Sequence, residues 1–198
     1  MQNENEWFYF INALDKKTCN KIRKLGKENW KEGQTFGSLE RNESLDGIRK
    51  SDIVWKNDQW VYDTIWDFML AANEQAGWKY DIRAAESMQI TRYKKGEFYH
   101  FHRDGNGDHL SVFDEPDNKF KHGYVRKLSM TVLLNENYEG GEFQFSNYRN
   151  QKCMIHTPEF NKTGSIIIFP SYVEHRVLPV TKGTRYSLVV WFLGPPFK

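Results

Sequence analysis

The chain has 198 residues, a formal net charge of +2 and two cysteines, Cys19 and Cys153. This small charge does not favour general affinity for nucleic acid or anionic membranes, and no apolar run approaches the roughly 18 residues of a membrane span. Two cysteines form no disulfide framework, and the polar N-terminus MQNENEW lacks the features of a signal peptide. We therefore expect one cytoplasmic domain, from a bacterial or phage-infected cell, without a membrane or nucleic-acid partner.

Two helices are expected in the N-terminal part of the chain. The first is expected over 15–30, where Asp15 can cap the helix and apolar residues recur at helical spacing. The second is expected over 58–76, and Gly77 ends it. Residues 31–50 are rich in Gly, Ser, Asn and charged residues, which predicts a loop.

After the second helix the pattern changes to short runs of β-branched and aromatic residues separated by turn-rich segments. Strands are expected over 86–93, 98–103, 127–134, 141–146, 152–156, 164–169, 173–180 and 184–193. Short strands at this spacing suit a double-sheet jelly roll or a barrel. The long polar loop 105–126 is a candidate lid over a site.

The stretch YKKGEFYHFHRD places His100, His102 and Asp104 at alternate positions. Alternate side chains of a strand point to one face, so these residues can supply ligands to one metal ion. Two histidines and one carboxylate form the facial triad that binds Fe(II) and leaves coordination positions open. The pair His102 and Asp104 fits this pattern, and His100 with His102 is the competing pair.

The C-terminal strands supply further candidates. His175 begins one strand, and Arg185 follows ten residues later in an apolar strand. A buried guanidinium is costly unless it meets a carboxylate, which it can bind through two parallel hydrogen bonds. Ser187 faces the same side as Arg185. We therefore expect a small diacid to fit between this strand and the metal.

Three motifs follow one another between about residues 86 and 193. Tyr93, Gly96, Tyr99, His102 and Asp104 match Y-x-x-G-x-x-Y-x-x-H-x-D; Gly140, Gly141, Glu142 and Phe143 match G-G-E-[LF]; Pro170, Ser171, His175, Pro179, Val180, Gly183, Arg185, Ser187 and Trp191 match P-S…H-x-V-x-P-V…G-x-R-x-S…W. In this order they resemble the Fe(II)- and 2-oxoglutarate-dependent dioxygenases, specifically the prolyl 4-hydroxylase-like branch.

The resemblance implies a mainly β fold with flanking α-helices, namely a double-stranded β-helix, or jelly roll, with the metal at its mouth. We expect a single dioxygenase domain over 1–198, with 1–80 as helical support and 81–198 as the jelly-roll core.

The resemblance also implies roles for individual residues. His102, Asp104 and His175 would be the catalytic residues that hold Fe(II). Arg185, helped by Ser187, would bind the distal carboxylate of 2-oxoglutarate.

Four further residues are expected around these ligands. Tyr93 and Thr131 would border the cosubstrate, and Tyr99 and Trp191 would lie at the substrate mouth. His100 is expected to be a bystander rather than a ligand.

The implied activity is hydroxylation of prolyl residues in a peptide or protein, with Fe(II), 2-oxoglutarate and O₂, with ascorbate as reductant, and with succinate and CO₂ as co-products. The alternatives are the same chemistry on a free amino acid, another side chain or an alkylated nucleobase, or a jelly-roll binding module without catalysis. A third alternative is a calcium loop from Asp104 to Glu115, although His109 stands where that loop needs glycine.

Overall fold

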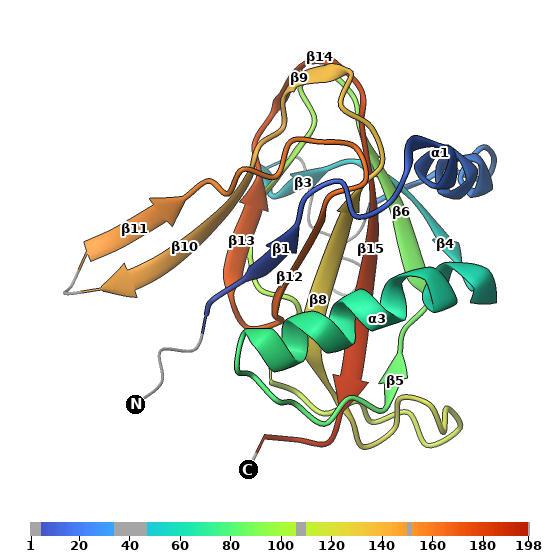
Figure 1. Ribbon diagram of the computed structural model, residues 1–198, viewed down its shortest axis with the longest axis vertical. Coiled ribbons are helices and arrows are strands. Elements are labelled where there is room, and N and C mark those ends of the chain that lie inside the picture. Colours follow the sequence, from blue (N-terminus) through green and yellow to red (C-terminus); the bar gives the residue numbers. More distant parts are fainter. Residues whose placement is uncertain (1–4, 34–46, 106–109, 150–151, 198) are drawn as a thin grey trace.

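The computed structural model describes residues 5–33, 47–105, 110–149 and 152–197. Two antiparallel sheets face each other, and two helices cover the outer face of the larger sheet (Figure 1). This is the expected jelly roll with flanking helices. Within the described residues, no helix has both the length and the apolar character needed to cross a membrane.

The larger sheet contains, in spatial order, β1 (Phe8–Phe10), β12 (Ile166–Pro170), β8 (Val125–Leu133), β15 (Arg185–Gly194), β6 (Met88–Tyr93), β4 (Asp52–Lys56) and β2 (Lys31–Glu32), with β5 (Ala84–Ala85) paired to β15. The smaller sheet contains β11 (Lys152–His156), β10 (Phe143–Arg149), β13 (Glu174–Val177), β7 (Phe98–His102) and β3 (Arg49–Lys50). A separate pair joins β9 (Tyr138–Gly140) to β14 (Val180–Gly183).

The first helix, α1 (Lys16–Leu25), begins where it was expected and ends earlier. The Asp15 carboxylate accepts a hydrogen bond from the Thr18 N–H at 2.6 Å, which caps the helix. Gly26 ends the helix, and its N–H donates to the Arg23 carbonyl. The second helix, α3 (Gln59–Gln75), agrees with the expected range and is followed by Gly77 at φ 82°.

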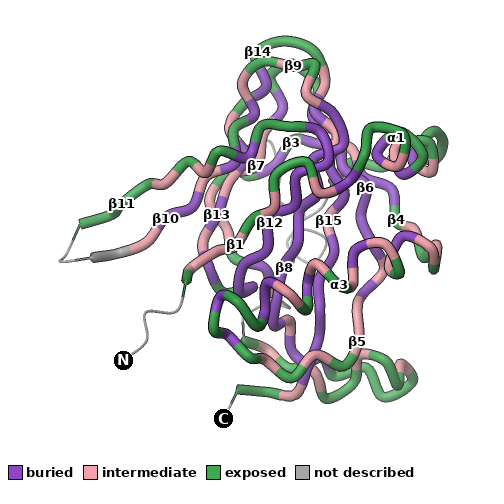
Figure 2. Tube along the Cα trace, viewed as in Figure 1, coloured by how far each residue is buried: buried purple, intermediate pink, exposed green. Residues whose placement is uncertain are grey.

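Alternation along β15 separates a hydrophobic core from a polar cavity. Leu188, Val190 and Phe192 are fully buried among the helices and the larger sheet. The intervening residues Arg185, Ser187, Val189 and Trp191 line a cavity between the sheets. In Figure 2 the central strands of the larger sheet, β12, β8 and β15, are mostly buried.

Residues 1–80 supply strands as well as helices. Strands β1 and β4 were not expected, and β2 and β3 lie at the two ends of the expected loop 31–50, of which 34–46 fall outside the described residues. These strands have two to five residues, too few for a clear period, and each is set by pairing with a longer strand.

The strand expected over 173–180 is divided into β13 and β14. Gly140 and Gly141 have φ 72° and 67°, and a Cβ on Gly140 would lie 2.5 Å from the Pro179 carbonyl oxygen. The turn at Gly140–Gly141 thus lies against the chain at Pro179, and the pairing of β10 with β13 ends before it, at Phe143 and Val177. The predicted ranges 141–146 and 173–180 were therefore wrong at these ends. Residues 110–124 form a loop without helix or strand, as expected.

Candidate metal centre and active-site cavity

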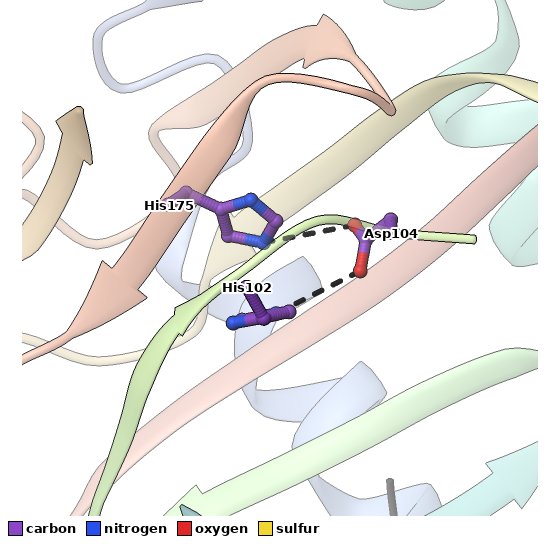
Figure 3. Close-up of side chains that lie close together, drawn as sticks. All are labelled: His102, Asp104 and His175. Atoms are coloured by element: carbon purple, nitrogen blue, oxygen red, sulfur yellow. Dashed lines mark ion pairs between the residues drawn. The ribbon is translucent and has the colours of Figure 1, made fainter. Parts of the chain in front are cut away.

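His102 and Asp104, two positions apart, meet His175, which lies far from them in the sequence (Figure 3). His102 ends β7 and pairs in register with His175 on β13. Each Nε2 lies 3.7 Å from one oxygen of the Asp104 carboxylate, and one ligand atom from each residue lies within 4.8 Å of the others. Two metal–ligand bonds of about 2.1 Å can span a separation of 3.7 Å between ligand atoms, so this group fits a transition-metal ion.

Both imidazoles present Nε2 to the centre. His102 Nδ1 lies 2.8 Å from the His100 carbonyl oxygen, and His175 Nδ1 lies 3.0 Å from that of Val173. A carbonyl oxygen only accepts hydrogen bonds, so each Nδ1 carries the proton and each Nε2 keeps its lone pair for a metal.

The local electrostatics favour the protonation states that bind a metal. Burial, together with the neighbouring His175, lowers the pKa of His102 to about 3. Burial alone raises the pKa of Asp104, but the neighbouring His175, His102, Arg126 and Ser129 together outweigh it and hold that pKa below its ordinary value. At neutral pH the site therefore offers a neutral imidazole and an ionised carboxylate.

His100 is exposed and lies outside the ligand group, as the sequence predicted. The reason is a bulge in β7: Val177 pairs with Tyr99 and His175 pairs with His102, so three steps on β7 match two on β13. The bulge turns Tyr99, rather than His100, to the same side as His102. His100 contributes to the site through its carbonyl oxygen.

The cavity beside this group has a volume of about 470 Å³. Every site residue expected from the sequence lines it, namely Tyr93, Tyr99, His102, Asp104, Thr131, His175, Arg185, Ser187 and Trp191. The sequence therefore identified a set of residues that the fold brings together.

Arg185 is the group in the cavity that best fits an anionic ligand. It is 1% exposed, and its Nη1 donates to the Ser187 hydroxyl at 3.1 Å. Its Nε and Nη2 are buried without a hydrogen-bond partner among the described residues. A guanidinium buried in this way is costly until a carboxylate accepts from both nitrogens, so the cavity fits a diacid that reaches from Arg185 to the metal ligands.

The structure adds residues that the sequence did not indicate. Arg126 forms a bidentate ion pair with Glu86, with N–O distances of 2.5 and 3.0 Å, and its guanidinium carbon lies 4.3 Å from the Trp191 ring centroid. The Trp55 and Trp191 ring centroids are 5.8 Å apart. Trp55 was not predicted as a cavity residue because it lies on β4, a strand that the sequence did not predict. Arg126 could have been predicted, because it directly precedes the expected strand 127–134.

The calcium-loop alternative falls partly on residues 106–109, outside the described residues. Of its described ends, Asp104 faces the two histidines, whereas Glu115 accepts a hydrogen bond from the Asn118 side chain at 3.0 Å. The carboxylates of Asp104 and Glu115 therefore contact different groups rather than one shared ion site.

A family model of the 2OG-Fe(II) oxygenase superfamily matches residues 88–193, more than half of the chain. The chain belongs to this superfamily, whose name states its metal and its cosubstrate. The matched range contains every cavity residue that the sequence indicated.

Two curated relatives are similar to about half of this chain. PKHD-type hydroxylase YbiX of Escherichia coli O1:K1 is 32% identical over 112 residues, which cover 55% of this chain and 44% of that protein. PKHD-type hydroxylase AM1_3707 of Acaryochloris marina is 34% identical over 116 residues, with 55% and 42% covered. The match thus spans less than half the length of these relatives.

Three solved structures share the fold. A prolyl-4-hydroxylase of Pseudomonas putida has a TM-score of 0.64 and 20% identity, with 94% of this chain and 91% of that chain covered. A viral collagen prolyl hydroxylase from Paramecium Bursaria Chlorella virus-1, solved with 2OG, has a TM-score of 0.64 and 18% identity, with 96% and 97% covered. A Trichoplax adhaerens prolyl hydroxylase, solved with a hypoxia inducible factor peptide, has a TM-score of 0.61 and 18% identity, with 96% and 84% covered.

Proposed function

We propose that this protein is an Fe(II)- and 2-oxoglutarate-dependent dioxygenase that hydroxylates prolyl residues of a peptide or protein, with succinate and CO₂ as co-products and ascorbate as a reductant. The observation that carries the proposal is one cavity that holds both a His–Asp–His group and a buried guanidinium, two of whose nitrogens have no hydrogen-bond partner among the described residues. The first fits Fe(II), and the second fits the distal carboxylate of 2-oxoglutarate.

Five cavity residues bind the metal and the cosubstrate in this proposal. His102, Asp104 and His175 hold Fe(II), which with 2-oxoglutarate and O₂ supplies the oxidising power for hydroxylation. Arg185 and Ser187 bind and orient the distal carboxylate. His102, His175, Arg185 and Ser187 lie on strands of the two sheets, and Asp104 directly follows β7. The protein therefore positions the reactants and contributes little further chemistry.

Tyr93 and Thr131 border the same space. Tyr93 is 4% exposed, and the Arg185 guanidinium carbon lies 5.8 Å from its ring centroid. Thr131 pairs with Val189 on β15, which places both beside Ser187 on the cavity side of the sheet. These walls exclude bulk water from the cosubstrate.

A prolyl substrate fits the aromatic end of the cavity. Trp55 is 46% exposed and adjoins the buried Trp191, whose Nε1 has no hydrogen-bond partner among the described residues. A proline ring packs well on aromatic faces, and an indole N–H can donate to a peptide carbonyl. The name of the prolyl-4-hydroxylase with a similar fold supports the same substrate class, and the names of the PKHD-type relatives support hydroxylation.

We also propose that the whole chain acts as one dioxygenase domain, with 81–198 as the core that carries the site. Helices α1 and α3 pack against the larger sheet from outside, and none of their residues lines the cavity. Their place is that of a support rather than of a substrate-binding element.

The test needs no substrate. Metal-free protein is mixed with Fe(II) and 2-oxoglutarate without oxygen, and the weak visible charge-transfer band of the chelated complex is recorded. His102→Ala and His175→Ala should abolish the band, whereas His100→Ala should retain it. A folded wild-type protein without the band contradicts the proposal. The substrate class is then tested by incubation with proline-containing peptides and by mass spectrometry for one added oxygen atom.

A further inference from the structure

The paired glycines Gly140 and Gly141 have no part in the proposed chemistry, yet they lie beside the cosubstrate end of the cavity. Gly140 ends β9, which pairs with β14, and β14 directly precedes the strand that begins at Arg185. In Figure 1 this short pair lies at the top of the molecule, above the start of β15. The turn at Gly140–Gly141 is therefore placed where it can contact the Arg185 side chain.

Gly141 leaves no room for a side chain between the turn and Arg185. A Cβ on Gly141 would lie 3.0 Å from Val180 Cγ2 and 3.1 Å from Arg185 Cδ, whereas favourable contacts between carbon atoms lie at about 3.5–4.0 Å. Gly141 also has φ 67°, a conformation that favours glycine. Because this residue has no Cβ, the aliphatic stem of Arg185 can lie directly against the main chain of the turn.

The charged end of Arg185 is held from other directions. Its Nη1 donates to the Ser187 hydroxyl at 3.1 Å, and its guanidinium carbon lies 5.8 Å from the Tyr93 ring centroid. With the stem against Gly141 and the head against these two residues, the guanidinium keeps one orientation in the cavity. A methyl group on Gly141 would displace the Arg185 stem and so turn its donor nitrogens, and hydrogen bonds weaken steeply when they are misaligned.

We propose that Gly141 is a positioning residue for Arg185, and that its missing side chain sets where the guanidinium meets the distal carboxylate of 2-oxoglutarate. The inference rests on the proposed function, because it takes 2-oxoglutarate as the ligand of Arg185. Gly141 acts through Arg185 alone. Two parallel hydrogen bonds to a carboxylate require both nitrogens to be aligned, so a displaced guanidinium keeps its charge but loses part of this paired contact.

The experiment measures the binding of 2-oxoglutarate and of Fe(II) separately. Fe(II)-loaded wild type and Gly141→Ala are titrated with 2-oxoglutarate without oxygen in a calorimeter, and Fe(II) affinity is measured on metal-free protein by competition with a coloured chelator. We expect Gly141→Ala to weaken 2-oxoglutarate binding by about 10-fold, which corresponds to one hydrogen bond to a charged group. Fe(II) affinity should stay the same.

The Fe(II) measurement shows whether the effect is confined to Arg185. Phe143, two residues after Gly141, stacks on the His175 imidazole, with ring centroids 5.4 Å apart and planes inclined by 16°. A general displacement of this part of the chain would therefore disturb the metal group as well. Equal losses of Fe(II) and 2-oxoglutarate affinity would overturn the proposal.

Gly96→Ala is the matched control for backbone strain. Gly96 has φ 81°, and its N–H donates to the Val180 carbonyl at 2.8 Å, so it lies in the same part of the molecule. A Cβ on Gly96 would meet nothing within 4 Å. Gly96→Ala thus introduces the same kind of strain without a contact to Arg185, and it should bind 2-oxoglutarate as wild type does. A loss equal to that of Gly141→Ala would assign the effect to strain and overturn the proposal.

A double-mutant cycle with Arg185→Ala tests whether Gly141 acts through Arg185. Arg185→Ala removes the Cδ atom that the new methyl group would meet. In this background Gly141→Ala should not weaken 2-oxoglutarate binding further, and urea unfolding should show a smaller loss in the free energy of unfolding than in the wild-type background. Additive effects in both measurements would overturn the proposal.

The remaining results also lead to distinct conclusions. Wild-type 2-oxoglutarate affinity in Gly141→Ala would overturn the inference and leave the proposed function intact. Failure of the Fe(II)-loaded wild type to bind 2-oxoglutarate would overturn both. If Gly141→Ala does not fold, recovery of folding in the double variant with Arg185→Ala supports the contact. If the double variant does not fold either, the contact with Val180 excludes the side chain, and the assignment to Arg185 is overturned.

Discussion

The Tyr99 phenol ring stacks on the His102 imidazole, with ring centroids 3.5 Å apart and planes inclined by 15°. The Arg49 guanidinium carbon also lies 4.6 Å from the Tyr99 centroid. Tyr99 was expected to lie at the substrate mouth, and it does line the cavity. The stack gives Tyr99 a further part, because it restricts rotation of the imidazole that we propose as a metal ligand.

Replacing Tyr99 should therefore affect metal binding as well as substrate binding. Aromatic pairs contribute about 0.5–1.5 kcal/mol beyond their buried area. Tyr99→Ala should weaken Fe(II) binding by roughly 2- to 10-fold, and Tyr99→Phe, which keeps the ring, should retain it. Chelator competition measures both. Equal affinity in Tyr99→Ala and wild type would show that the stack does not orient His102.

Loss of the Arg185 guanidinium should separate cosubstrate binding from metal binding. Arg185→Ala removes charge-assisted hydrogen bonds worth roughly 2–3 kcal/mol, on the order of 100-fold in 2-oxoglutarate affinity. Fe(II) affinity should not change, because Arg185 contacts none of the three ligands in the hydrogen bonds and ion pairs of the described residues. Calorimetric titration of each ligand makes the comparison.

Arg185→Lys is the informative control for this prediction. Lysine keeps the charge but cannot make two parallel hydrogen bonds, so its 2-oxoglutarate affinity should lie between those of Arg185→Ala and the wild type. A parallel loss of Fe(II) and 2-oxoglutarate binding in both variants would mean that Arg185 maintains the fold of the cavity instead.

The exposed indole of Trp55 should affect the peptide and not the cosubstrate. Trp55→Ala should raise the KM for a proline-containing peptide by about 10-fold, as is typical when an aromatic contact at an interface is lost. The KM for 2-oxoglutarate should stay the same. Phe120→Ala is the matched control, because Phe120 is 77% exposed and does not line the cavity. A similar effect of both substitutions would argue against a peptide contact at Trp55.

Several parts of the site followed from the sequence because they depend on local spacing. The H-x-D pair lies within three residues, and period two along β15 placed Arg185 and Ser187 on one face. The bulge in β7 did not follow, since it arises from the pairing of β7 with β13. It decided that His100 points away and that Tyr99 stacks on His102.

The short strands also could not be predicted from the local sequence. In β4 the segment DIVWK has no clear period, and it is placed by β6, where Asp52 pairs with Arg92 at 2.7 Å. Trp55 enters the cavity only through this pairing. The contact between the Ser129 and Ser171 hydroxyls was equally hidden, because these residues are 42 residues apart and meet through the register of β8 and β12.

Glu136 should make stability depend on pH in the acid range. Its carboxylate accepts from the Thr163 N–H at 3.0 Å and pairs with Lys16 at 2.9 Å, and these contacts lower its pKa from 4.5 to about 2. The unfolded chain binds a proton at higher pH than the folded chain. The stabilisation is therefore present above pH 4.5 and is lost as the pH falls toward 2.

Glu136→Gln should lower the free energy of unfolding at pH 7 by no more than about 1 kcal/mol, because the group is partly exposed, and the difference should disappear as the pH falls through and below about 2. Urea unfolding at several pH values measures this. Glu139→Gln is the control: it removes an ion pair with Lys182 at 2.7 Å but no main-chain hydrogen bond seen among the described residues. Equal pH profiles for the two variants would contradict the role of the Thr163 N–H.

Gly164 should be far more sensitive to substitution than Gly77, although both have φ 82°. A Cβ on Gly164 would lie 1.8 Å from the Leu14 carbonyl oxygen, whereas a Cβ on Gly77 would meet nothing within 4 Å. Gly77→Ala should cost the roughly 1–2 kcal/mol of a left-handed residue. Gly164→Ala adds a backbone clash where the Gly164 carbonyl accepts from the Leu14 N–H and the Gly164 N–H donates to the Leu133 carbonyl.

The clash cannot be relieved by a side-chain rotation, because the atom in the way belongs to the main chain. We therefore expect Gly164→Ala to lower the free energy of unfolding by more than about 4 kcal/mol, which is exceptional for a single substitution, or to prevent folding. Urea unfolding of the two variants beside wild type gives the difference. Equal stabilities would show that the segment around Leu14 moves away from Gly164 at little cost, and that the contact between the N-terminal segment and the start of β12 is loose.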